Sequence, residues 1–307
     1  MIATIATHQV RSLTRQGTFV AMLGVLGAMT ALAGVLGWSS HHTIVSVYEQ
    51  AKVLLDSQGQ PPPPNPFGLK PPLSLLSNMV VYIPLIGALL ALVVGHLAFA
   101  DDQSGGVGRL VFSRPVARHS YLAGKIAAIA GVLAAIMTAG LLITAVSLLI
   151  VNHAIAGSDL VRLAGFFALS WLYLLVFALV GMVAVALNRR RSLGLLSAMG
   201  AWLVITFVLP QFTSGLRPTS SLNPITEPVG TSQAFFRATA HVRPFSIAGQ
   251  YKDAATHILD TATAAAAETS WQTVLHIAPI AGAVVLLTVA LIALAGRHDY
   301  SRSATNE

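Results

Sequence analysis

The 307-residue sequence contains no cysteine and little charge. Without cysteine there is no disulfide, no thiolate metal ligand and no cysteine nucleophile. Only 9% of the residues are Asp, Glu, Lys or Arg, whereas about 25% are charged in an ordinary soluble domain. Hydrophobic residues make up 55% of the chain, and they lie in long uninterrupted blocks instead of being dispersed as in a soluble core. The composition therefore indicates an integral membrane protein.

Several motifs that carry chemistry are also missing. The phosphate-binding pattern Gly-x-x-x-x-Gly-Lys-Ser/Thr is absent, because Gly124-Lys125 is followed by Ile126 and lacks the upstream glycine. There is no Gly-x-Ser-x-Gly elbow, and no Ser, His and Asp cluster can be assigned. The adjacent His41 and His42 do not easily supply two ligands of one tetrahedral metal site. We therefore expect no catalytic residues, metal or cofactor on this chain.

Six apolar segments are long enough to cross a bilayer, since about 20 helical residues span a hydrocarbon core of about 30 Å. None contains Asp, Glu, Lys or Arg, and none alternates as a barrel strand does, so each is expected to be a helix. The lack of an intramembrane carboxylate also disfavours an ion-coupled transporter. The predicted fold is an all-α membrane protein, residues 1–307 forming one domain, with spans at about 18–38, 76–100, 126–151, 163–187, 192–212 and 274–296.

The basic residues predict the orientation of these spans. Lys and Arg collect in loops on the cytoplasmic side of a membrane. Eleven of the 18 would lie together on one side, and they are Arg11, Arg15, Arg109, Arg114, Arg118, Lys125, Arg189, Arg190, Arg191, Arg297 and Arg302. Both termini are therefore expected in the cytoplasm. Because these cations lie in short runs between apolar blocks, the net charge of +7 predicts no nucleic-acid partner.

The opposite side carries the longer loops. The first, 39–75, contains a proline-rich run at 61–66 that favours an extended spacer. The largest, 213–273, is expected to form an outer loop domain between spans five and six. Within it, 246–269 predicts a helix with an apolar stripe at three-to-four spacing, which either packs on the protein or lies on the membrane. Whether the first apolar segment is cleaved as a signal peptide stays open.

The connection between spans two and three is unusually patterned for a plain loop. Leu110, Val111 and Phe112 are apolar residues among charges, which indicates a surface that docks on a partner. Ser113 can cap a new helix, and Pro115 is tolerated in its first turn. From the residues alone, a docking surface and an interfacial turn that only carries positive charge remain equally open.

This segment resembles the first cytoplasmic loop of ABC transporter permeases of the type-two exporter class. Asp102 stands at the acidic position and Gly106 at the glycine, Ser113-Arg114-Pro115-Val116 matches directly, Arg118 is the second arginine, and Gly124-Lys125 closes the motif. Val107 and Gly108 depart from the Thr-Leu of the pattern. The chain looks most like the permeases that accompany nitrous oxide reductase maturation and gliding motility.

The resemblance implies that 101–122 is a coupling segment seated on a separate ATPase subunit. The residues implied in docking are Asp101, Asp102, Gly106, Arg109, Leu110, Val111, Phe112, Ser113, Arg114, Pro115 and Arg118. It further implies a multi-pass protein of the bacterial cytoplasmic membrane, a second permease copy or related permease, and ATP and magnesium on the partner ATPase. A non-transporting membrane scaffold or assembly factor is the alternative, and a membrane-embedded enzyme is disfavoured by the missing catalytic groups.

The orientation is testable because the chain has no natural cysteine. Single cysteines at Gln60 and Ser220 should react with a membrane-impermeant thiol reagent in intact cells, whereas a cysteine at Ser303 should not. Gln60 and Ser220 lie in loops predicted to face outward, and Ser303 follows the last span. Labelling at Ser303 from outside would reverse the predicted topology.

Overall fold

The computed structural model describes residues 2–15, 17–61, 73, 76–103, 117–152, 155–188, 190–213, 240–259 and 270–297, and within these it is helical without strands. The first half contains α1 (Ile2–Arg15), α2 (Thr18–Ser57), α3 (Ser77–Tyr82), the π-helical η2 (Ile83–Gly87), α4 (Ala88–Gln103) and α6 (Arg118–Asn152). The second half contains α7 (Gly157–Leu187), α8 (Arg191–Leu203), the π-helical η3 (Val204–Val208), α9 (Leu209–Thr213), the 3-10 helix η4 (Ala240–Phe245), α11 (Ile247–Ile258) and α12 (Ser270–Arg297).

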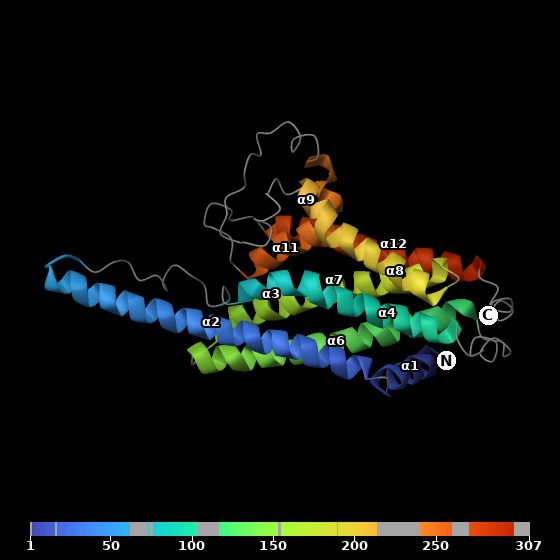
Figure 1. The fold of residues 1–307 in the computed structure, drawn as a ribbon, viewed down its shortest axis with the longest axis horizontal. Coiled ribbons are helices and arrows are strands. Elements are labelled where there is room, and N and C mark those ends of the chain that lie inside the picture. Colours follow the sequence, from blue (N-terminus) through green and yellow to red (C-terminus); the bar gives the residue numbers. More distant parts are fainter. Residues whose placement is uncertain are drawn as a thin grey trace.

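The long helices run side by side in a bundle (Figure 1). Helix α7 lies at its centre and contacts α4, α6, α8, α11 and α12. Of its most apolar stretch 72% is buried, compared with 11% for the corresponding stretches of α8–α9 and α12. The apolar surfaces of α8–α9 and α12 therefore face outward, where lipid or a second protein can cover them.

Five helical segments are long and apolar enough to cross a membrane: Asn78–Ala100, His119–Ile150, Gly157–Leu187, Arg191–Phe212 and Thr273–Leu294. They coincide with five of the six spans predicted from the sequence, which confirms an all-α, multi-pass membrane fold. In the first predicted span, a shorter apolar stretch, Val20–Leu32, lies within α2. The count of six spans stays a prediction.

Helix α2 continues well past the expected end of the first span at Trp38. Its 40 residues end at Ser57 and are followed by Gly59 in a left-handed conformation with φ 70. The sequence has neither Gly nor Pro between Trp38 and Gln58, so nothing in it interrupts the helix. At 1.5 Å per residue, α2 is about 60 Å long, roughly twice the hydrocarbon thickness of a bilayer. Residues 39–57, expected to begin an extended loop, therefore form a rod that projects beyond the bundle (Figure 1).

Helices α4 and α7 touch through their backbones. A Cβ added to Gly95 would lie 1.9 Å from the Ala178 carbonyl oxygen, and one added to Gly181 would lie 2.3 Å from the Leu92 carbonyl oxygen. Small residues permit such close approach between membrane helices, where van der Waals contact drives association. Small residues recur every four positions in the segment that contains α4, at Gly87, Ala91 and Gly95, and this stripe is internal packing. Cβ atoms at Gly131 in α6 and Gly282 in α12 would meet nothing within 4 Å.

Both π-helical turns lie within membrane-length segments. Pro84, which lacks an N–H and therefore disrupts regular helix bonding, lies in η2. The Trp202 indole Nε1, one residue before the last residue of α8, donates to the Pro84 carbonyl oxygen at 3.4 Å. This bond ties the segment containing α8 and η3 to the beginning of the α3–α4 segment.

The α4–α7 contact predicts a glycine-specific loss of stability. Gly95→Val should lower the melting temperature of the detergent-solubilised protein, because overpacking at a backbone contact costs about 1–3 kcal/mol or more. Gly200→Ala is the matched control, since a Cβ there meets nothing within 4 Å and alanine is the better helix former. Equal melting temperatures for Gly95→Val and the parent protein, measured by size-exclusion after heating, would contradict this packing.

Candidate functional site

The two helices that flank the candidate docking segment meet at one end of the bundle. Helix α4 ends there at Gln103, and α6 begins there at Arg118. Helix α1, the turn between α7 and α8, and the end of α12 lie at the same end (Figure 1). We call the connection from Gln103 to Arg118 the elbow, and this end of the bundle the elbow end.

The basic residues are distributed between the two ends as the sequence predicted. Among the described residues, the basic residues at the elbow end are Arg11 and Arg15 of α1, Arg118 and Lys125 of α6, Arg190 and Arg191 at the α7–α8 turn, and Arg297 at the end of α12. Those of the opposite loops and helix ends are Lys52, Arg162, Arg243 and Lys252. The structure therefore groups these charges at opposite ends of the bundle, and which end faces the cytoplasm stays a prediction.

The predicted docking residues lie at and between the ends of α4 and α6. Asp101 and Asp102 belong to the last turn of α4, and Arg118 is the first residue of α6. The others, Gly106, Arg109, Leu110, Val111, Phe112, Ser113, Arg114 and Pro115, lie outside the described residues. The structure thus fixes where the docking segment leaves one helix and enters the next.

Lys125 joins these two helices inside the bundle. Its side chain is 1% exposed, and its Nζ donates a hydrogen bond to the Ala98 carbonyl oxygen of α4 at 2.5 Å. The same ammonium group lies 5.7 Å from the centre of the Phe99 ring and 5.2 Å from that of Tyr121. The sequence predicted Lys125 just before a span starting at Ile126. Helix α6 instead starts at Arg118 and packs against α1, α4 and α7, and Lys125 is buried inside this packing.

Helix α1 packs at the elbow end of the bundle. It contacts α2, α4 and α6, with Leu13 and Gln9 buried against the bundle. Its last residue, Arg15, is exposed and is separated from α2 by Gly17, which has φ 73 and acts as the turn. An amphipathic helix in this position rests on the bundle at the elbow end instead of crossing it.

The opposite end contains a second polar cluster, centred on α11. Ser246 caps α11 by accepting a hydrogen bond from the Gly249 N–H, and Tyr251 is fully buried. The Oη of Tyr251 lies 3.0 Å from the Ser170 Oγ, which itself donates to the Phe166 carbonyl oxygen, so Tyr251 is the donor of that bond. The predicted helix is thus confirmed for 247–258, and it packs on α7 and α12, which answers the question left open by its apolar stripe.

Two histidines, His257 and His276, take part in this cluster. His276 Nδ1 lies 2.5 Å from the Gln250 Oε1, and the His276 ring stacks on that of His257 at 6.2 Å. In the described part of the chain, no group of three His, Cys, Asp or Glu side chains is placed to hold a metal ion. Nearby, burial lowers the pKa of Lys252, and the Asp253 carboxylate partly offsets this effect.

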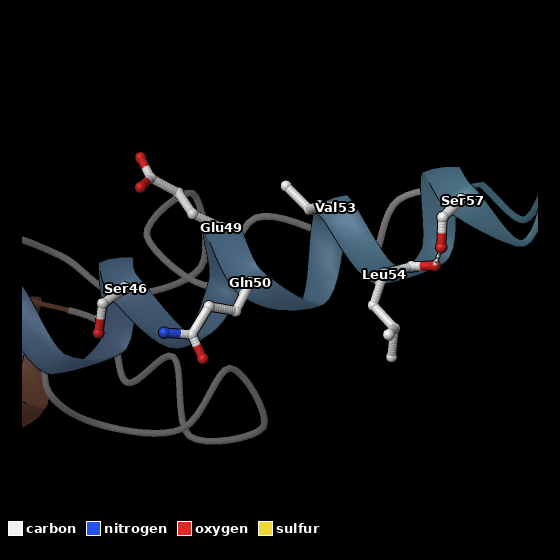
Figure 2. Close-up of a pocket in the computed structure, with 6 residues that line it drawn as sticks. All are labelled: Ser46, Glu49, Gln50, Val53, Leu54 and Ser57. Carbon is white, nitrogen blue, oxygen red and sulfur yellow. Dashed lines mark hydrogen bonds between the residues drawn. The ribbon is translucent and has the colours of Figure 1, made fainter.

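A shallow pocket on the projecting part of α2 is lined by polar side chains that do not point toward one another. In Figure 2, Glu49 and Val53 lie on one side of the helix, and Gln50 and Leu54 lie on the other. Its lining residues all come from this single helix, and they are Ser46, Glu49, Gln50, Val53, Leu54 and Ser57. Because the polar groups diverge, the pocket offers neither an acid–base pair nor a phosphate cradle.

No curated protein matches the chain. A family model described as "ABC-2 family transporter protein" matches residues 1–297, which include every described helix. The match agrees with the multi-pass helical fold and with the resemblance seen in the loop between the second and third predicted spans. The chain therefore belongs to the ABC-2 family of transporter proteins.

Proposed function

We propose that this chain is the membrane-spanning permease subunit of an ABC exporter, whose ATP and magnesium are bound by a separate ATPase subunit in the cytoplasm. The observation that supports this proposal most strongly is the contact between the two helices that flank the elbow. Two membrane-length segments are held together where they enter and leave it, by a buried contact between Lys125 and Ala98. The family match over 1–297 supports the same assignment.

Two rigid elements would transmit a movement of the elbow into the membrane. Helix α6 runs without a break for 35 residues, about 52 Å at 1.5 Å per residue. Helix α4 is locked to the central α7 at Gly95 and Gly181. A displacement of the elbow by an ATPase would therefore reach both the continuous helix α6 and the α4–α7 pair, to which Lys125 joins it.

Further partners follow from the outward-facing helices. Val285, Leu286 and Val289 of α12 are between 58% and 71% exposed, as expected for residues covered by lipid or by another subunit. We assign the second partner as another permease copy or a related permease, because alternating access needs two halves that move against each other. The setting is the bacterial cytoplasmic membrane, where the elbow end faces the ATPase. The transported substrate is not assigned.

Docking through the apolar part of the elbow predicts a strong effect of Phe112→Asp on ATPase association. A fully buried Phe contributes about 1.5–3 kcal/mol, whereas an exposed ion pair contributes about 0–1 kcal/mol. Phe112→Asp should therefore abolish co-purification of the ATPase while membrane abundance is unchanged. Arg118→Ala should weaken association modestly, and more visibly at low salt, where exposed charges are less screened.

The matched control is Val47→Asp, which places the same charge on an exposed apolar position of the projecting α2, away from the elbow. It should leave ATPase association intact. Full association of the Phe112→Asp protein would show that the elbow is not the docking surface. Recovery of a partner that binds no nucleotide, instead of an ATPase, would favour the scaffold alternative.

A further inference from the structure

Lys125 is a cation in an apolar part of the bundle. It lies seven residues after the start of α6 at Arg118, which is about two turns inside the helix. Its side chain is 1% exposed, although lysine is almost never fully buried unless it is paired. Removing an ammonium group from water is costly, so the protein has to replace its hydration with fixed groups.

The groups around Lys125 come from both helices that flank the elbow. Ala98 and Phe99 belong to the last two turns of α4, and Tyr121 belongs to the first turn of α6. A backbone carbonyl oxygen can accept a hydrogen bond from an ammonium group, and the face of an aromatic ring attracts a cation within about 6 Å. The ammonium group is thus held by a directional hydrogen bond to α4 and by one ring from each helix.

We propose that Lys125 is a positioning residue that clamps the exit of α4 to the entry of α6 and so sets the geometry of the elbow. This inference rests on the proposed function, because it gives the clamp a role in presenting the docking segment to the ATPase. A long apolar side chain could fill the same space. It would not fix the register between α4 and α6, because apolar contacts are not directional. A hydrogen bond to one particular carbonyl is directional and does fix the register.

The effect of the Lys125 contact on the geometry of the elbow end can be measured on the permease alone. Because the chain has no cysteine, spin labels can be attached at Ala117 and Arg190, which are exposed at the elbow end on different helix termini. Pulsed electron paramagnetic resonance then gives the distribution of distances between the two labels in lipid nanodiscs. Lys125→Met, which keeps the length of the side chain and removes its charge and donors, should make this distribution about twofold broader, since the elbow would populate more than one arrangement.

Two variants control the experiment. Lys125→Arg, which keeps a cation and several donors, should restore a distribution close to that of the parent protein. Lys52→Met removes an exposed lysine from the projecting α2 and should leave the distribution unchanged. An unchanged distribution in the Lys125→Met protein would overturn the proposal. If Lys125→Met does not accumulate as a monodisperse protein, Tyr121→Leu decides, because it removes one ring and leaves the lysine: broadening supports the clamp and no broadening overturns it.

The affinity for the ATPase tests whether the Lys125 contact affects docking. It also distinguishes failure of the proposal about Lys125 from failure of the proposed function. If about one molecule in ten of the Lys125→Met protein holds a competent elbow, the Kd for the ATPase should rise about tenfold, while the parent and Lys125→Arg proteins bind equally well. A broadened distribution with unchanged Kd would overturn the role of the clamp in docking. If the parent protein binds no ATPase, the proposed function fails, and the distance distribution still decides whether Lys125 positions the elbow.

Discussion

The backbone contact between α4 and α7 is the constraint on which the rest of the structure depends. Without side chains at Gly95 and Gly181, the two helices approach until the carbonyl of one meets the Cα of the other. Helix α7 then carries α11 through Ser170 and Tyr251, and α4 carries the beginning of the elbow. One tight pair of helices therefore fixes the positions of features at opposite ends of the bundle.

The two ends differ in how their polar groups are held. At the α11 end, polar side chains pair with one another, as in the contact between Gln250 and His276 and the exposed ion pair between Arg243 and Asp253. At the elbow end, one buried cation bridges two helices through Ala98. A buried charge that loses its partner is costly, so the second arrangement tolerates fewer geometries than the first. The coupling role that we propose for the elbow needs such a restricted contact.

Much of the fold could be predicted from the sequence, because charge-free apolar runs in lipid have few alternatives to helix. Five of the predicted spans followed from that rule, whereas the buried stripe of α11 followed from apolar residues at three-to-four spacing. The length of α2 was missed because the proline run at 61–66 suggested an extended loop, although the first helix-breaking residue after Trp38 is Gly59. The burial of Lys125 was missed because a lysine beside an apolar run is usually its boundary. Its partner Ala98 is distant in sequence, and backbone carbonyls leave no sequence signal.

The central claim is that the elbow touches an ATPase, and site-specific photocrosslinking tests it most directly. A photoreactive amino acid at Val111 should form a covalent adduct with the ATPase subunit on irradiation of intact membranes. The same probe at Val53, exposed on the projecting α2, should form none. An ATPase that co-purifies with the chain and crosslinks from Val53 but not from Val111 would contradict the account.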